Sequence, residues 1–236
     1  MTAEELWPGG PRFCQSEHFR LSTDSVLLAD FARPRPAARG IDLGCGSGIL
    51  PLLLLERDER LRMTGLELQP GAAETARENL ALNSLTERAE IVVGDIRRCR
   101  ALFAAGSFDF AVSNPPYFPE GSGALSPRED RAAARCEGSC SLAELADAAA
   151  WLLHTGGSFF LVHRPERLSE LCVTLSAAGL EPKRLRPVCH RADKAPALIL
   201  LEARRGGRPG LSFEAPLVLS AADGTESEEY RRIYHR

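Results

Sequence analysis

The feature that most constrains the fold is a regular alternation of short apolar runs with longer helix-like segments. The expected strands are residues 40–44, 62–67, 89–94, 108–114, 157–163, 185–190 and 197–203. The expected helices are residues 49–57, 70–83, 141–154 and 166–178. Strand–helix alternation at this spacing builds right-handed βαβ units, in which a mainly parallel sheet carries helices on both faces. The 236 residues therefore predict an α/β fold and a single domain, residues 1–236.

Three segments lie outside this alternation. Residues 12–37 are expected to form a small hairpin followed by a helix capped at Thr23 or Asp24. Residues 118–140 form a long polar stretch with several arginines, and a loop of that length usually has a function, here expected to be substrate binding. Near the end of the chain, Tyr230, Ile233 and Tyr234 share the i, i+3, i+4 spacing of an apolar helix stripe.

Composition excludes several classes of protein. The most apolar run, residues 49–55, has seven residues and contains a proline, whereas a membrane span needs about 20 apolar residues. No basic, apolar leader is visible at the start, and the seven cysteines show no paired pattern, so we expect reduced thiols and a cytoplasmic protein. Cys136 and Cys140 lack a second ligand pair, so no metal site is expected.

The net charge of −3 argues against a surface that is basic throughout. Residues 181–210 nevertheless contain eight Lys or Arg and three acids, a local charge of +5. Arg128, Arg131 and Arg135 add positive charge in the long loop. These cations either contact nucleic-acid phosphates or form an ordinary solvated face.

A glycine-rich turn follows the first expected strand of the sheet, at residues 42–48 (DLGCGSG). Glycines at such a turn let the backbone bend tightly and approach a ligand at a helix N-terminus. The dinucleotide fingerprint would need a glycine at Ile49, so the spacing instead resembles motif I of class I S-adenosylmethionine (SAM) methyltransferases. By that resemblance the cofactor-binding residues of this turn are Asp42, Gly44, Cys45, Gly46 and Gly48. The alternative is a tight turn that binds no ligand.

Acids also end the next two strands. Glu67 closes the second, where a carboxylate can accept hydrogen bonds from both ribose hydroxyls of a nucleotide, and Leu68 beside it is expected to contact the cofactor. After the third strand, the resemblance implies that Asp95 contacts the adenine N6 of SAM and that Ile96 packs on the adenine ring. The alternatives are a solvated glutamate at 67 and a helix-capping aspartate at 95.

The most specific motif is Asn114, Pro115, Pro116 and Tyr117 (NPPY), which ends the fourth strand. Two consecutive prolines fix φ and lack donors, so the Pro115 carbonyl and the Asn114 amide oxygen form two acceptors able to hold an –NH2 group. Tyr117 offers a ring that can stack on a flat base or amide. The motif resembles that of methyltransferases acting on planar nitrogens, namely adenine N6, cytosine N4 or a glutamine amide. Asn114 is expected to contact both substrate and cofactor, and the histidines are expected to be structural or surface residues.

From about residue 12 to 234 the chain resembles the bacterial tRNA1(Val) adenine-37 N6-methyltransferase family. The resemblance is carried by residues 19–28 (FRLSTDSVLL), 42–48, 114–118, 131–137 (RAAARCE), 160–167 (FLVHRPER) and 181–187 (EPKRLRP). It implies a Rossmann-like class I sheet of seven strands with its last strand antiparallel, and Thr23 and Asp24 near the methionine end of SAM. It also implies tRNA as the partner and S-adenosylhomocysteine as the product, with no obligate protein partner.

Two other enzyme classes share parts of this pattern. Protein-glutamine N5-methyltransferases of the release-factor type carry the same four-residue motif, but they have a long helical N-terminal domain, and only about 38 residues precede the first strand of the sheet here. DNA adenine methyltransferases carry a separate target-recognition domain, for which no room remains. A non-catalytic SAM- or RNA-binding module is the third alternative.

Overall fold

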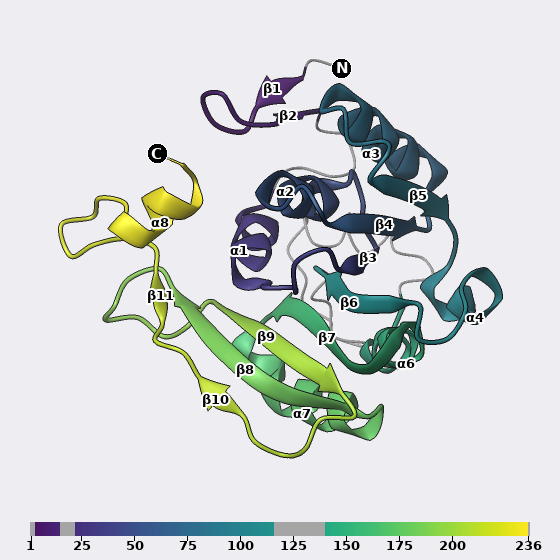
Figure 1. Cartoon of the computed structure of the whole chain (residues 1–236). Helices are drawn as coiled ribbons and strands as arrows, with labels where there is room; N and C mark the ends of the chain where they lie inside the picture. Colours follow the sequence, from purple (N-terminus) through teal and green to yellow (C-terminus); the bar gives the residue numbers. More distant parts are fainter. Residues whose placement is uncertain (1–2, 15–21, 116–139, 236) are drawn as a thin grey trace, which may run out of the picture.

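The computed structural model describes residues 3–14, 22–115 and 140–235, and its centre is a nine-stranded sheet (Figure 1). The strands are β3 (Arg39–Leu43), β4 (Arg62–Glu67), β5 (Ala89–Val93), β6 (Phe108–Ser113), β7 (Leu153–His163), β8 (Leu180–Cys189), β9 (Leu198–Arg205), β10 (Ser212–Phe213) and β11 (Leu217–Val218). The helices are α1 (Thr23–Phe31), α2 (Ile49–Arg57), α3 (Pro70–Leu82), α4 (Cys99–Leu102), α6 (Leu142–Leu152), α7 (Leu168–Ala177) and α8 (Glu228–Ile233), with 3-10 turns η1 (Ile96–Arg98) and η2 (Pro165–Arg167).

The strand order is β10-β8-β9-β7-β6-β3-β4-β5, with β11 paired to β8. Strands β3 to β7 run parallel to one another, whereas β9 is antiparallel to both β7 and β8. The expected mainly parallel sheet with an antiparallel last long strand is therefore confirmed. The two-residue strands β10 and β11, which add to the edge at β8, were not expected from the sequence.

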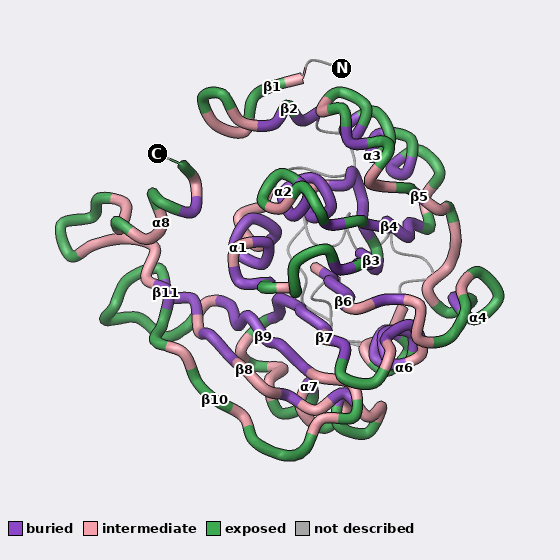
Figure 2. Tube along the Cα trace, in the orientation of Figure 1, coloured by how far each residue is buried: buried purple, intermediate pink, exposed green. Residues whose placement is uncertain are grey.

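Helices cover both faces of the sheet, as the alternation predicts. On one face, α1, α2 and α3 bury their apolar side chains against residues such as Val112 and Phe160. On the other face, α6 and α7 pack against Ile41 and Phe159. Neighbouring strand residues such as Phe159 and Phe160 point to opposite faces, and both are buried. The central strands are therefore buried on both sides, whereas β5 and β10 at the two edges are largely exposed (Figure 2).

The N-terminal segment differs in detail from the expectation. Its hairpin pairs β1 (Glu4–Glu5) with β2 (Arg12–Phe13), so one strand lies before residue 12. The cap of α1 is Ser22, one residue before Thr23. Ser22 has an extended backbone and its side chain accepts the N–H of Ser25, so the expected caps at Thr23 and Asp24 are wrong.

Other boundaries shift by a few residues, and the end of the chain is helical. Strand β7 begins at Leu153 and β8 at Leu180, four and five residues before their expected starts. Helix α6 begins as expected after Ser141, which forms a capping box with Glu144. In α8, Ile233 is buried in the core, which confirms the predicted apolar stripe. Within the described residues, no helix is both long and apolar enough to cross a membrane.

Candidate functional site

The carboxyl ends of four adjacent strands meet at one edge of the sheet. β3 lies between β4 and β6, and β5 lies beyond β4, so the strand order reverses next to β3. The backbone N–H of Gly44 donates to Leu66 O at 2.9 Å, and Gly94 N–H donates to Glu67 O at 2.8 Å. Ligands in open α/β sheets bind at such a reversal, outside the carboxyl ends of the strands.

The glycines of the turn after β3 have two different roles. Gly44 has φ +82, and among the described residues an added Cβ there would meet only Ile96 Cδ1, at 4.0 Å. Gly48 has φ +81, but an added Cβ would lie 3.0 Å from the Cβ of Ala76 in α3. Gly44 therefore leaves open space above the strand ends, whereas Gly48 is required by close helix packing.

Glu67, at the end of β4, fastens this turn. Its carboxylate accepts the N–H of Gly46 at 2.8 Å and the N–H of Gln69 at 2.9 Å, and the residue is only 5% exposed. The solvated glutamate considered as an alternative is therefore wrong. Each carboxylate oxygen has two lone-pair sites, so capacity remains for further donors such as ribose hydroxyls. Leu68, immediately after it, is 47% exposed at the same edge.

Asp42 is the most unusual group of the site. It is 1% exposed, and among the described residues neither of its carboxylate oxygens has a hydrogen-bond partner. Burial, and secondly the charge of Glu67, raises the pKa of Asp42 well above its ordinary value. Burial likewise raises the pKa of the adjacent Cys45 thiol. An unsatisfied buried acid beside a glycine turn fits a ligand that brings positive charge, and SAM carries both an ammonium and a sulfonium.

Asp95 begins the turn after β5, and its side chain is engaged locally. It accepts the N–H of Arg97 at 2.9 Å and pairs with the Arg97 guanidinium at 2.6 Å. The hydrogen bond from Arg97 lowers the pKa of Asp95 below its ordinary value. Asp95 thus caps the following turn, as the alternative interpretation expected. The contacts of Asp95 and Ile96 with an adenine remain predictions.

Asn114 ends β6 and connects the site to α1. Its Nδ2 donates to Ser25 Oγ at 3.0 Å and to Ser22 Oγ at 3.3 Å. Because Thr23 and Asp24 form the first turn of α1, this contact brings both of them to the edge that carries the glycine turn. Pro115 follows Asn114 directly, whereas Pro116, Tyr117 and residues 118–139 lie outside the described residues.

Asn79, which supports the glycine turn, was not expected from the sequence. Asn79 of α3 is fully buried and its Nδ2 donates to Ser47 O, in the glycine turn, at 2.9 Å. The same side chain donates to Cys14 O at 3.1 Å and accepts Cys14 N–H at 2.7 Å. It thereby joins the N-terminal segment to the turn. The sequence signal for it is an asparagine at helical spacing from Ala72, Ala73, Ala76 and Leu80, on the buried face of α3, where asparagine has a poor helix propensity.

Two arginines of the basic stretch at residues 181–210 are paired within the fold. Arg184 donates to Glu202 at 2.9 Å and to Glu214 at 2.8 Å. Arg186 donates to Glu229 at 2.8 Å and is 9% exposed. Because the charges of Arg184 and Arg186 are compensated by these acids, we expect neither residue to contact phosphate, and phosphate contacts by the other cations of the stretch remain predictions. Arg128, Arg131 and Arg135 lie outside the described residues.

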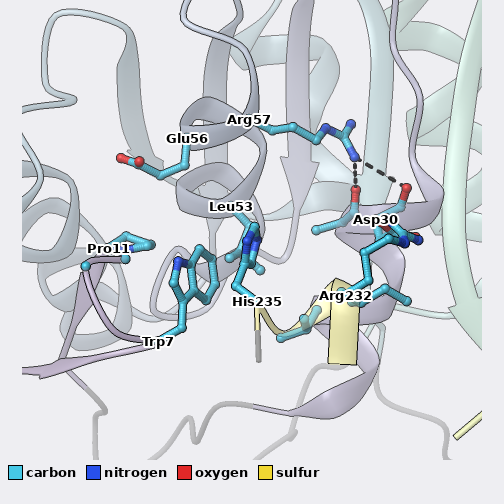
Figure 3. A pocket seen from close by; sticks show the side chains of 13 residues that line it. Trp7, Pro11, Asp30, Leu53, Glu56, Arg57, Arg232 and His235 are labelled. Atoms are coloured by element: carbon cyan, nitrogen blue, oxygen red, sulfur yellow. Dashed lines mark hydrogen bonds and ion pairs between the residues drawn. The ribbon is translucent and has the colours of Figure 1, made fainter. Parts of the chain in front are cut away.

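A pocket on the outer side of α1 and α2 does not belong to this site. It lies between the N-terminal hairpin and α8, where the rings of Trp7 and His235 stack with centroids 4.2 Å apart (Figure 3). Arg57 donates there to Ala29 O at 2.6 Å, and Arg232 pairs with Asp30 at 3.3 Å. These contacts hold the C-terminal end of α1, whereas Asn114 contacts its N-terminal end.

Comparisons with known proteins agree with this geometry. The family model described as methyltransferase small domain matches residues 18–172. The tRNA1(Val) (adenine(37)-N6)-methyltransferases of Porphyromonas gingivalis (strain ATCC 33277) and Tolumonas auensis are 34% and 33% identical to the chain. The alignments cover 91% and 89% of this chain and 86% of each relative. A crystal structure of a predicted O-methyltransferase from Agrobacterium tumefaciens superposes with a TM-score of 0.71 at 23% identity, covering 90% of this chain and 96% of that one.

A sheet in this order, with a glycine turn and buried acids at its carboxyl edge, defines a class I SAM-dependent methyltransferase. The chain belongs to the methyltransferase small domain family and, within it, to the family of the tRNA1(Val) (adenine(37)-N6)-methyltransferases.

Proposed function

We propose that this protein methylates the exocyclic N6 of an adenine in tRNA, adenine 37 of tRNA1(Val), as the names of its relatives state for them. The structural observation that carries the proposal is the side chain of Asn114, held at the carboxyl end of β6 beside the glycine turn. In this proposal the protein acts in the cytoplasm, and the six cysteines among the described residues are free thiols there.

SAM supplies the methyl group as a sulfonium. The residues proposed to hold it are Thr23, Asp24, Asp42, Gly44, Cys45, Gly46, Gly48, Glu67, Leu68, Asp95, Ile96 and Asn114. The support is that the turn after β3, the ends of β4 and β5 and the first turn of α1 share one edge of the sheet. The unsatisfied Asp42 carboxylate and the open space over Gly44 favour a cationic ligand at that edge.

The chemistry proposed for Asn114 and Pro115 follows from the acceptor. The lone pair of an exocyclic adenine amine is delocalised into the ring, so the amine is a poor nucleophile. Two hydrogen bonds, accepted by Asn114 Oδ1 and the Pro115 carbonyl, favour a pyramidal amine whose lone pair can point at the methyl group. Positioning of this kind and preorganised dipoles supply most of the rate, and no strong base is needed because the proton leaves after methylation.

A base inside a folded tRNA must be turned out of its stack to reach this edge. In the proposal, Tyr117 stacks on the extruded adenine and Pro116 stiffens the backbone between Tyr117 and the two acceptors. Residues 118–140 are proposed to contact the substrate, as the long polar segment next to these acceptors. The whole chain, residues 1–236, acts as one methyltransferase domain, with residues 12–37 as an N-terminal extension.

The test is methyl transfer from labelled SAM to total bacterial tRNA, release factor and duplex DNA in parallel. The expected result is label in tRNA, recovered as N6-methyladenosine after digestion to nucleosides. Asn114 is only one of the residues proposed to contact SAM, so Asn114→Ala should raise the Kd for SAM by no more than about threefold. It should lower turnover at least 10²-fold, the scale of losing one preorganised polar group. Label in release factor alone would overturn the tRNA assignment and assign a glutamine amide to the same acceptors.

A further inference from the structure

Two hydroxyl groups at the start of α1 contact the side-chain amide of Asn114, and the proposed reaction gives them no role. Ser25 Oγ lies 3.0 Å from Asn114 Nδ2, Ser22 Oγ lies 3.3 Å from it, and the two hydroxyl oxygens are 3.2 Å apart. Ser25 is 5% exposed although it stands in the first turn of its helix. The Asn114 amide is proposed to hold the substrate. The buried hydroxyl of Ser25 contacts this amide and can therefore set its orientation.

We propose that Ser25 is a positioning residue, which fixes the orientation of the Asn114 amide so that Oδ1, and not Nδ2, meets the amine to be methylated. This inference rests on the proposed function, in which Asn114 accepts a hydrogen bond from that amine. An amide has two unlike ends, and rotation about χ2 by half a turn exchanges them. In the wrong orientation two –NH2 groups would face each other, and no acceptor would remain on Asn114 for the substrate.

The hydrogen bonds around Ser22 explain why Ser25 selects one orientation. Ser22 Oγ accepts the backbone N–H of Ser25 at 3.3 Å and one N–H of Asn114 Nδ2, which fills its two lone pairs and leaves its own hydrogen for Ser25 Oγ. The second N–H of Nδ2 donates to Ser25 Oγ, so the amide bonds to both serines while the serines remain bonded to each other. With Oδ1 in that place, both hydroxyls could bond to the amide only if the bond between the two serines were broken.

The two serines can be separated by experiment because their helix-capping roles differ. Ser22 caps α1 with its side chain, so its removal would disturb the helix itself. Ser25 contributes only its backbone N–H to that cap, and this group survives in Ser25→Ala. The hydroxyl of Ser25 can therefore be deleted while the cap of α1 is kept.

The first measurement compares Ser25→Ala with the wild type and with Ser25→Thr, which restores a hydroxyl. We expect Ser25→Ala to lower kcat about tenfold, while KM for the methyl acceptor and Kd for SAM stay within about twofold. Ser25→Thr should recover most of the lost kcat. Thr75→Val is the matched control, because Thr75 is also a buried helical hydroxyl but, among the described residues, bonds only to Gly71 O of its own helix, at 3.1 Å.

The second measurement repeats the deletion in an Asn114→Asp background. A carboxylate presents two equivalent oxygens, so it has no wrong orientation and should not need Ser25. We expect Ser25→Ala to change the single-turnover rate of Asn114→Asp by less than about twofold, whereas it costs about tenfold with Asn114 present. Double-mutant comparison of this kind isolates the coupling between two residues in contact.

Failure of this inference is distinguishable from failure of the proposed function. If the wild type labels release factor or DNA and not tRNA, the tRNA assignment falls, and the Ser25 variants are compared on the substrate that is labelled. The inference itself is overturned if Ser25→Ala turns over at the wild-type rate. It is equally overturned if the loss is the same in both backgrounds, or if it appears as weaker SAM binding or a lower melting temperature, because these indicate a structural role.

Discussion

The carboxylate of Glu67 accepts the backbone N–H of Gly46 at 2.8 Å, so the end of β4 holds the turn that follows β3. A second oxygen of the same carboxylate accepts the N–H of Gln69 at 2.9 Å. Glu67 is thus built into the turn before any cofactor binds. This relationship makes the turn and the neighbouring strand end one unit.

Replacing Glu67 should therefore weaken cofactor binding in addition to removing a ribose acceptor. We expect Glu67→Ala to raise the Kd for SAM at least tenfold, measured by isothermal titration calorimetry. It should also lower the free energy of unfolding by about 1–3 kcal/mol, since two buried N–H groups lose their acceptor. Glu78→Gln, on the exposed side of α3, is the control and should change neither quantity. Unchanged SAM affinity in Glu67→Ala would contradict the role given to Glu67.

The buried, unsatisfied carboxylate of Asp42 should destabilise the protein while it serves the ligand. We expect Asp42→Asn to raise the melting temperature by about 2–4 °C, equivalent to about 1 kcal/mol for a domain of this size, and to raise the Kd for SAM at least tenfold. Because the pKa of Asp42 is raised, the folded state holds its proton more tightly than the unfolded state does. The stability cost of Asp42 therefore grows as the pH rises above its ordinary pKa, and the advantage of Asp42→Asn should be larger at pH 7 than at pH 4.

His163, at the end of β7, should make the protein acid-sensitive. It is 3% exposed, its Nδ1 accepts the N–H of Arg164 at 2.8 Å, and burial lowers its pKa to about 4. The unfolded chain binds a proton at His163 near pH 6.5, whereas the folded protein does so only near pH 4. The contribution of neutral His163 to the free energy of unfolding is therefore complete above about pH 6.5 and is lost as the pH falls towards 4. The loss amounts to about 3 kcal/mol at most.

Denaturant unfolding of His163→Asn between pH 7 and pH 4 measures this effect. The asparagine keeps an acceptor for Arg164 N–H but does not titrate, so the variant should lose less stability on acidification than the wild type. His154→Asn is the contrasting control. The Thr155 carbonyl, and secondly Asp109, raises the pKa of His154. Protonated His154 therefore adds a small contribution to the free energy of unfolding at low pH, and this contribution is lost as the pH rises. Equal acid slopes for wild type and His163→Asn would contradict the prediction.

Asn79 of α3 and Asn83, the residue that caps the C-terminal end of α3, lie one turn apart and make similar contacts at different depths. Asn79 is fully buried between Ser47 and Cys14, whereas Asn83 bonds to the exposed backbone of Arg12 at 2.7 and 2.8 Å. We expect Asn79→Ala to lower the free energy of unfolding by about 2–3 kcal/mol and Asn83→Ala by less than about 1 kcal/mol, because water replaces only the exposed contacts. If urea unfolding gives equal losses of unfolding free energy for Asn79→Ala and Asn83→Ala, burial does not explain the difference between the two residues.

Arg184 should matter for stability and not for tRNA binding. Its guanidinium bonds to Glu202 and Glu214, donates to Phe31 O at 2.9 Å and lies over the Phe31 ring at 3.9 Å. Arg184→Met removes one cation from Glu202 and Glu214, which keep Arg204 at 3.2 Å and Arg186 at 3.9 Å respectively. It should therefore cost about 1.5–3 kcal/mol of unfolding free energy, the scale of losing a hydrogen bond to a charged group. The salt dependence of tRNA affinity should stay as in the wild type, because no phosphate contact is removed. A shallower salt dependence in Arg184→Met would show that Arg184 contacts the nucleic acid.

Local patterns in the sequence were sufficient for the sheet and for the position of the site along the chain. Short apolar runs and alanine-rich helices specify βαβ units because each depends only on neighbouring residues. In any parallel sheet the residues that follow the strands lie at the carboxyl edge. The glycine turn, the acids at 67 and 95 and Asn114 each follow a strand, so their common edge could be predicted. The boundaries were less accurate, as at Ser22 and Leu180, because caps and strand ends depend on hydrogen bonds that no pattern encodes.

The sequence by itself determined the class of fold, the glycine turn and the acceptor at Asn114, since these depend on residue type and short spacing. Only the tertiary structure decided how each charged or polar group is used. It buried Asp42 without a partner, paired Arg184 with Glu202 and placed Ser25 against Asn114, 89 residues away in the chain. Side chains so far apart meet only when the sheet and its helices pack, and the burial that results sets their protonation, their partners and their orientation.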